Sequence, residues 1–129
     1  MAPNLNGIDH IHINVSDRAK AEHWHKDVLG FSRVPEFEFW AVDGGPLTLT
    51  DESGLIHLAL FESDNIQSTT IALKVSASGL KEWIYHLSVN GIEVTPVDHQ
   101  LSWSLYFKDI DGNPFEITTY EYDEFKIAA

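Results

Sequence analysis

Two stretches of the sequence share one pattern, IHINVSDRAKAEHWHKDVLGFSRV at residues 11–34 and IALKVSASGLKEWIYHLSVNGIEV at residues 71–94. They begin sixty residues apart, and each runs from alternating apolar and polar residues into a helical stretch that ends near a glycine. Strict alternation indicates a strand with one buried face. Because self-similarity at a fixed spacing marks a duplicated structural unit, the sequence predicts two copies of one module.

Each module is expected to contain a strand, a helix and three further strands. Ser16 and Ser76 follow the first strands and are predicted to cap the helices. Gly30 and Gly91 stand where the helices should end, because glycine tolerates the left-handed conformation of a helix terminus. The further strands are expected at residues 32–41, 47–51 and 55–62, and at residues 93–98, 103–107 and 114–120.

The predicted fold class is α+β, in which two tandem βαβββ modules form a cupped mixed sheet with helices on its outer face. The modules are expected at about residues 7–62 and 69–120 of a single domain that spans residues 1–129. A chain of 129 residues has the size of one ordinary domain. We therefore interpret the duplication as internal to one domain.

Composition excludes several classes of protein. The chain has 8 Lys and Arg against 20 Asp and Glu, a net charge of −12, which argues against nucleic acid or an anionic membrane as a partner. Without cysteine it can form no disulfide and no thiolate metal site. No signal peptide and no apolar run of membrane-spanning length is present, so a soluble, cytoplasmic protein is expected.

One face of the predicted strands carries residues that bind metals. His10 and His12 lie on that face of the first strand, with His57 in the first module and Glu116 in the second. His10 corresponds to Thr70 in the repeat, and His57 corresponds to Glu116. Two imidazoles and one carboxylate suit Fe, Mn, Ni or Zn, so His10, His57 and Glu116 are the predicted ligands if the two sheets curve together. His12 is a rival for the same role, and a hydrogen-bonded structural role is the alternative for each histidine.

The remaining histidines and the tryptophans have simpler expected roles. Trp40 is expected either to pack or to line a pocket. The other tryptophans, Trp24, Trp83 and Trp103, are expected to pack, and His23, His25, His86 and His99 are expected on helix surfaces or in loops.

Two runs, IDHIHINVSDRAKAEHWHKDVLGF at residues 8–31 and SLYFKDIDGNPFEI at residues 104–117, resemble the two ends of the vicinal oxygen chelate superfamily. That superfamily includes glyoxalase I, fosfomycin-resistance enzymes, bleomycin-resistance proteins and extradiol ring-cleaving dioxygenases. The resemblance covers almost the whole chain and implies paired βαβββ modules. It also implies a homodimer in which each cavity uses both chains.

The resemblance further implies roles for particular residues. His10 matches the first metal ligand of metal-using relatives, and Glu116 matches the glutamate after the Asp-Gly-Asn turn. The histidine that usually opens the second module is replaced by Thr70, and His57 stands where glyoxalase-type relatives place a ligand. Ser104 and Tyr106 resemble pocket residues of the fosfomycin enzymes. Those enzymes need basic residues near the chain end. Lys126 is the sole candidate there in this sequence, so a phosphonate substrate is not expected.

Two classes of function follow from these residues. The first is a metal-dependent enzyme that chelates vicinal oxygens of a small molecule, a lyase, isomerase or ring-cleaving dioxygenase, with Glu116 also acting as a catalytic base. The second is a metal-free binding protein for a small aromatic or cationic compound, with Phe61 among its stacking residues. A third reading is a divergent member that keeps only a dimer interface. Expected substrate-binding residues are His12, Trp40, Thr70, Trp103, Ser104 and Tyr106.

Overall fold

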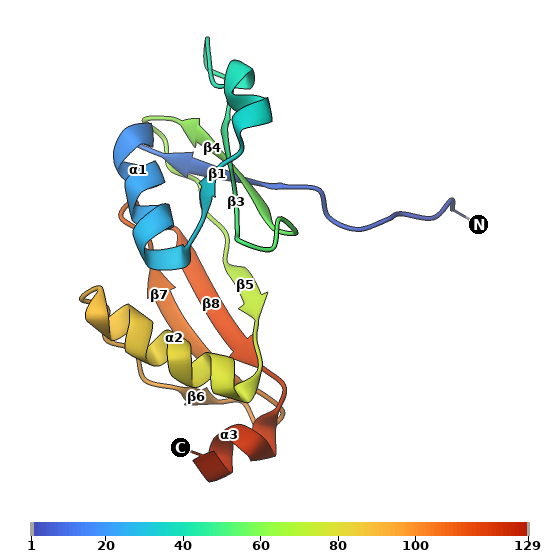
Figure 1. Cartoon of the computed structure of the whole chain (residues 1–129), viewed down its shortest axis with the longest axis vertical. Coiled ribbons are helices and arrows are strands. Elements are labelled where there is room, and N and C mark those ends of the chain that lie inside the picture. Colours follow the sequence, from blue (N-terminus) through green and yellow to red (C-terminus); the bar gives the residue numbers. More distant parts are fainter. Residues whose placement is uncertain (1, 129) are drawn as a thin grey trace. The chain divides into compact units, whose positions relative to one another are not determined.

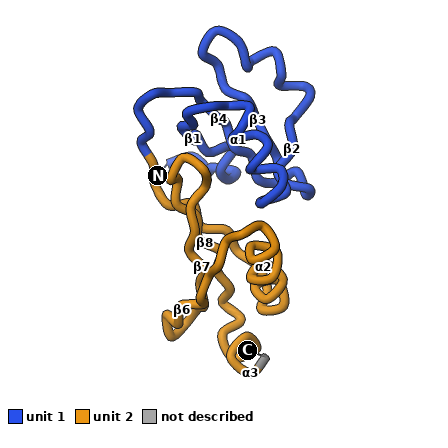
Figure 2. Tube along the Cα trace, turned by 90° about the vertical axis from the view of Figure 1, so that its left-hand side faces the viewer, with its two compact units in different colours: residues 1–67 blue, residues 68–129 orange. Residues whose placement is uncertain are grey.

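The computed structural model describes residues 2–128, which form two compact units divided between Gln67 and Ser68 (Figure 2). Each unit contains one four-stranded sheet with a helix after its first strand (Figure 1). The predicted α+β class and the duplicated βαβββ pattern are therefore confirmed. Among residues 2–128, no helix has the length and apolar character needed to span a membrane.

The first unit is a sheet with strand order β1-β4-β3-β2. Strand β1 runs parallel to β4, and the other pairs are antiparallel. The elements of this unit, in chain order, are β1 (Ile11–Val15), α1 (Arg18–Trp24), the π-helical turn η1 (His25–Leu29), β2 (Ser32–Arg33), the 3₁₀ helix η2 (Pro35–Trp40), β3 (Leu47–Thr50) and β4 (His57–Glu62).

The second unit repeats this topology, with strand order β5-β8-β7-β6 and a parallel pair formed by β5 and β8. Its additional element is a helix at the end of the chain. The elements are β5 (Ile71–Lys74), α2 (Ala77–Val89), β6 (Val97–Asp98), β7 (Trp103–Lys108), β8 (Pro114–Thr119) and α3 (Tyr122–Ala128).

The helix ends follow local capping chemistry. The hydroxyl of Ser76 accepts the N–H of Gly79 at 3.0 Å and caps α2 as expected. In α1 the cap is Asp17, whose carboxylate accepts the N–H of Lys20 at 3.1 Å, so the prediction of Ser16 was one residue off. Gly30 ends the first helical stretch in the left-handed conformation, with φ of 77°.

Apolar residues of one strand parity form the core, which follows from the alternation in the sequence. In the first unit Val15 and Leu60 are fully buried, and in the second unit Leu105 is fully buried. Helix α2 contributes Leu80 and Leu87, also fully buried, and packs against β8. The opposite parity is thereby left free to carry polar residues in both sheets.

Three elements differ from the sequence prediction. Residues 32–41 form only the short strand β2 before the 3₁₀ helix η2, because Pro35 fixes a helical φ at the first helical position. Strand β6 contains only Val97 and Asp98 of the expected residues 93–98, and α3 was not expected. The side chain of His25 is fully buried, contrary to the expected surface position. His25 follows the buried Ala21 by four residues, so both face the same side of the helical stretch.

Candidate functional site

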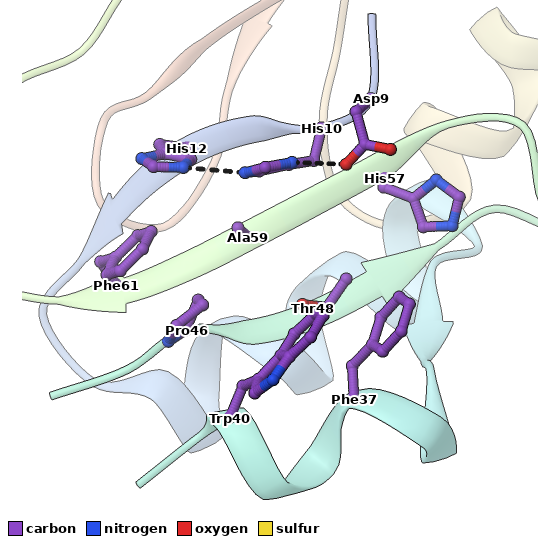
Figure 3. A pocket seen from close by; sticks show the side chains of 10 residues that line it. All are labelled: Asp9, His10, His12, Phe37, Trp40, Pro46, Thr48, His57, Ala59 and Phe61. Carbon is purple, nitrogen blue, oxygen red and sulfur yellow. Dashed lines mark hydrogen bonds and ion pairs between the residues drawn. The ribbon is translucent and has the colours of Figure 1, made fainter. Parts of the chain in front are cut away.

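A cavity of about 530 Å³ lies in the first unit, between the polar face of its sheet and the 3₁₀ helix η2 (Figure 3). The small side chain of Ala59 and the hydroxyl of Thr48, both buried, leave room for it at the centre of the sheet. Its lining residues are Asp9, His10, His12, Phe37, Trp40, Pro46, Thr48, His57, Ala59 and Phe61.

Asp9, His10 and His12 form a hydrogen-bonded row along β1 and the residues that precede it (Figure 3). Nδ1 of His10 lies 2.8 Å from Oδ2 of Asp9, and Nε2 of His10 lies 2.9 Å from Nε2 of His12. A carboxylate only accepts hydrogen bonds, so Nδ1 of His10 is the donor. In the neutral ring, the lone pair of His10 therefore sits on Nε2, on the side of His12.

His57 belongs to the same face as His10 and His12. The parallel register pairs Ile11 with Leu58, so the residues that immediately precede them, His10 and His57, point to one side of the sheet. The sequence alternation predicted this shared face in the first module, and the structure confirms it. The assignment of His57 as a ligand remains a prediction.

Aromatic rings stand on two sides of the cavity. Phe37 and Trp40 are stacked on η2, with ring centroids 4.4 Å apart and planes 15° from parallel. Across from them, the rings of His12 and Phe61 lie 4.7 Å apart on β1 and β4 (Figure 3). Trp40 lines the cavity, and 46% of its surface is exposed to solvent.

The polar face of the second unit is organised around Glu116 on β8. The hydroxyl of Ser104, on the neighbouring strand β7, lies 2.8 Å from Oε2 of Glu116 and 2.9 Å from Oγ1 of Thr118. Tyr106 is paired with Glu116 across the two strands, and its hydroxyl lies 2.8 Å from Nε2 of His99. Ser104 and Tyr106, which the resemblance indicates as pocket residues, thus lie on the same face as Glu116.

Trp103, one of the predicted substrate-binding residues, does not join this face, whereas Thr70 has the strand parity of Ala72, which is paired with Glu116. Trp103 points to the other side of β7, where it stacks on Tyr122 with centroids 5.5 Å apart and contacts Phe125. It packs against α3, as one of its two expected roles requires, and its role in ligand binding remains a prediction. Thr70 is exposed and lies immediately before β5.

The predicted metal ligands are divided between the units, with His10 and His57 in the first and Glu116 in the second. Over residues 2–128, no three His, Asp or Glu side chains gather into a metal-binding group. The donor chemistry nevertheless fits a divalent ion. The imidazole nitrogen of His10 is oriented by a carboxylate, an arrangement typical of metal-binding histidines.

Sequence reasoning missed Asp9 and Phe37. Asp9 directly precedes His10, but its contact with Nδ1 depends on the side-chain rotamers of both residues. Phe37 and Trp40 are three residues apart, the repeat of a 3₁₀ helix, which would have placed both rings on one side had residues 35–40 been recognised as helical.

Comparison with known proteins identifies relatives that match most of the chain. The chain is 31% identical to metallothiol transferase FosB of Staphylococcus epidermidis over 125 residues, covering 89% of this chain and 84% of that protein. It is 32% identical to the FosB of Staphylococcus haemolyticus with the same coverage.

Solved structures share the fold. An integron cassette protein from the mobile metagenome of the Halifax Harbour sewage outfall aligns with a TM-score of 0.77 and 22% identity, over 89% of this chain and 99% of that one. The fosfomycin resistance protein FosX of Listeria monocytogenes, in complex with Mn(II) and 1S,2S-dihydroxypropylphosphonic acid, aligns with a TM-score of 0.72 and 18% identity, over 98% and 100% of the two chains.

A family model describes the same span. The model of the Glyoxalase/Bleomycin resistance protein/Dioxygenase superfamily matches residues 7–117, which include every strand from β1 to β7 and most of β8. This agrees with the resemblance inferred from residues 8–31 and 104–117. The chain therefore belongs to the Glyoxalase/Bleomycin resistance protein/Dioxygenase superfamily.

Proposed function

We propose that this chain is a divalent-metal-dependent enzyme that binds vicinal oxygens of a small molecule. The observation that carries the proposal is the contact of Asp9 with Nδ1 of His10, which directs the Nε2 lone pair of His10 along the wall of the cavity. The staphylococcal relatives are named metallothiol transferases, and the FosX structure contains Mn(II), which supports the use of a metal here.

His10 and Glu116 are the proposed ligands, and His57 is the predicted third. His12 is the alternative third ligand, because its Nε2 lies 2.9 Å from that of His10. Two nitrogens that bind one ion at right angles are about 3 Å apart when each bond is about 2.1 Å long. Fe, Mn, Ni and Zn all accept such a donor set.

This chain's own residues orient the ligands. Asp9 holds the tautomer of His10, and Ser104 donates to Glu116 or to Thr118, one at a time. A bound divalent ion supplies Lewis-acid stabilisation of negative charge on substrate oxygens. Glu116 is the proposed base that removes or returns a substrate proton.

The proposed reaction classes are those predicted from the sequence, lyase or isomerase chemistry and ring-cleaving dioxygenation. Thiol transfer joins them, because the relatives at 31% and 32% identity carry that activity in their names. The homodimer implied by the resemblance and the cytoplasmic location expected from the sequence remain predictions. Analytical ultracentrifugation tests the homodimer.

Elemental analysis of purified protein tests the metal. We expect close to one transition-metal ion per chain in the wild type, and a large loss in His10→Ala and in Glu116→Ala. His23→Ala is the matched control, because the side chain of His23 is 81% exposed on α1. Unchanged metal content in both site variants would refute the proposed ligands.

A metal-free binding protein is the second candidate function. Thr70 occupies the position at which the resemblance places a metal-binding histidine, and aromatic rings form much of the cavity wall. Thermal unfolding with and without a chelator separates the two functions. An ion at a hundred times its dissociation constant adds about 2.7 kcal/mol to the unfolding free energy, so a melting curve unmoved by chelator and by added Mn, Fe, Ni and Zn favours the binding protein.

A further inference from the structure

We propose that His99 is a positioning residue for Tyr106, and that its imidazole sets whether the Tyr106 hydroxyl donates or accepts a hydrogen bond at the polar face that carries Glu116. This inference rests on the proposed function, since it concerns the surroundings of Glu116, the proposed ligand and base. Three observations within the second unit carry it. They are the strand register at Glu116, the contact between the rings of His99 and Tyr106, and the anchoring of the turn that holds His99.

Tyr106 stands beside Glu116 on the polar face of the second sheet. The antiparallel register pairs the two residues directly across β7 and β8, and directly opposed side chains leave a sheet on the same side. Tyr106 is 45% exposed, so its ring is not enclosed in the core. A molecule bound at the carboxylate of Glu116 therefore has the phenol of Tyr106 as a neighbour.

The hydroxyl of Tyr106 is in turn held by His99. Nε2 of His99 lies 2.8 Å from the phenol oxygen, and the two rings meet edge to face, with centroids 6.0 Å apart and planes at 86°. A phenol has one proton to donate, and its oxygen also accepts hydrogen bonds. The direction of this single contact therefore fixes what the hydroxyl can offer to a bound molecule.

The protonation of Nε2 decides that direction. When Nε2 carries no proton, Tyr106 donates to His99, and the phenol oxygen is left as an acceptor. When Nε2 carries a proton, as it does in every imidazolium, His99 donates to Tyr106. The phenol proton is then free for an oxygen of the substrate, which it stabilises most when that oxygen is negatively charged. Protonated His99 thus makes Tyr106 a hydrogen-bond donor to the substrate.

Hydrogen bonds hold the turn that carries His99. The carboxylate of Asp98 accepts the N–H of Gln100 at 2.8 Å, and the hydroxyl of Tyr122 on α3 lies 2.8 Å from both oxygens of Asp98. The N–H of His99 donates to the carbonyl of Ser102 at 2.9 Å. Gln100 has a φ of 72°, a left-handed conformation that is uncommon for residues other than glycine. The turn is therefore held in one conformation, in which the ring of His99 meets Tyr106.

Imidazole alone among the side-chain types around this contact ordinarily changes its charge between about pH 5 and 8. Hydrogen bonds from the N–H of Gln100 and the hydroxyl of Tyr122 lower the pKa of Asp98 below its ordinary value of 3.8, so the anchor of the turn stays charged over that range. A change at Tyr106 in this range therefore reports on His99. The other titratable side chains on the neighbouring elements are Asp98, Lys108, Glu116, Tyr122, Asp123, Glu124 and Lys126.

NMR spectroscopy of the full metal-free chain, labelled with ¹³C at Cζ of tyrosine, tests the contact. The chain has 4 tyrosines, and Tyr106→Phe identifies the resonance of Tyr106. We expect this resonance to shift between about pH 5 and 8, because reversal of the hydrogen bond changes the electron density of the phenol. His99→Gln should abolish the shift, since glutamine can bond the hydroxyl but does not titrate.

The control for this titration is His23→Gln, which changes a histidine whose side chain is 81% exposed on α1 and should leave the shift of Tyr106 unchanged. Thermal unfolding checks that His99→Gln is folded. A resonance of Tyr106 that does not depend on pH, or a shift that persists in His99→Gln, would overturn the inference.

Binding of oxalate to the chain saturated with Mn(II) tests the consequence for the site. Oxalate offers two vicinal oxygens, and both of its carboxyl groups are ionised at about pH 6 and above. As the pH rises from about 6 to 8, the wild type should lose about tenfold more oxalate affinity than His99→Gln, because only the wild type loses a donor to a charged group. Tyr106→Phe should behave like His99→Gln. Equal pH dependence in the wild type and His99→Gln would overturn the inference.

The two proposals fail in distinguishable ways. The NMR titration needs no metal, so a pH-independent resonance of Tyr106 overturns the positioning role even if the protein binds metal through His10 and Glu116. If the shift of Tyr106 depends on His99 but the chain binds neither metal nor oxalate, the positioning of Tyr106 stands and the metal-dependent enzyme is wrong.

Discussion

The hydroxyl of Ser104 lies 2.8 Å from the carboxylate of Glu116, at a position in β7 that is fully closed to solvent. The same hydroxyl lies 2.9 Å from Oγ1 of Thr118, which in turn donates to the carbonyl of Trp103 at 3.2 Å. A buried serine between two acceptors has one proton to share. Its contact with Glu116 therefore limits the rotamers of the proposed ligand.

Ser104→Ala should weaken both stability and metal binding. Removing a buried hydroxyl that serves two partners should lower the free energy of unfolding by about 1–3 kcal/mol. Loss of a residue that orients a ligand should weaken metal affinity by about 10-fold or more. Urea unfolding and metal titration measure the two effects. Ser88→Ala is the control, since the hydroxyl of Ser88 makes a similar 2.9 Å hydrogen bond to Glu93 at an exposed site, and a metal affinity that falls equally in both variants would contradict the assignment.

Asp9→Asn should weaken metal binding while leaving the fold intact. The amide still reaches Nδ1 of His10 but carries no charge, so the imidazole becomes a less basic ligand. The Asp9 side chain is 96% exposed, so we expect an effect near the lower limit for such changes, about tenfold in dissociation constant. Competition with a fluorescent chelator measures it, with Asp64→Asn as an exposed control in the same unit. Equal metal affinity of wild type and Asp9→Asn would show that the contact does not tune His10.

The turn between β3 and β4 should make the unfolding free energy depend on pH in the acid range. Burial raises the pKa of Asp51, but hydrogen bonds from the Ser53 hydroxyl and from the N–H groups of Ile56, Ser53 and Leu55 outweigh it and leave the pKa below its ordinary value of 3.8. A lowered pKa means stability that is fully present above pH 3.8 and is lost as the pH falls through the folded-state value. The difference in unfolding free energy between wild type and Asp51→Asn should therefore shrink as the pH is lowered from 6 to 2.

Urea unfolding at several pH values measures this difference. The control is Ser53→Ala, which removes one donor to Asp51. Ser53→Ala should reduce the pH dependence of the unfolding free energy in the wild-type background. It should have little effect on that pH dependence in the Asp51→Asn background. A constant difference between wild type and Asp51→Asn across this range would contradict the role of the turn.

Leu80→Ala should destabilise the second unit strongly. Leu80 is fully buried on the inner face of α2, so its truncation leaves a cavity and should cost about 2–5 kcal/mol. Val89→Ala is the matched control at the end of the same helix, where Val89 is 66% exposed and the expected change is below about 0.5 kcal/mol. Thermal and urea unfolding measure the loss of stability in each variant. Similar losses in the two variants would mean that α2 is not packed as described.

Much of this organisation follows from local patterns. Alternation placed the apolar residues of β1 and β4 on one face and His10, His12 and His57 on the other, because a strand turns successive side chains to opposite sides. The same rule puts Ser104 and Tyr106 on one side of β7, and the register between β7 and β8 puts Glu116 on that side. Ser76 and Gly30 acted as the expected helix signals, since capping depends on a few consecutive residues.

The sequence by itself thus determined the duplicated modules and the polar face of each sheet, which follow from its repeat and its alternation, and the family, which rests on the motif runs at residues 8–31 and 104–117. Tertiary structure decided which side chains close the cavity. Phe37 reaches it only because the chain after β2 turns into a 3₁₀ helix that folds over the sheet, and Trp103 takes its packing role because Tyr122 and Phe125 of α3 lie against it. Both outcomes depend on contacts between segments distant in the chain, which local propensity does not encode.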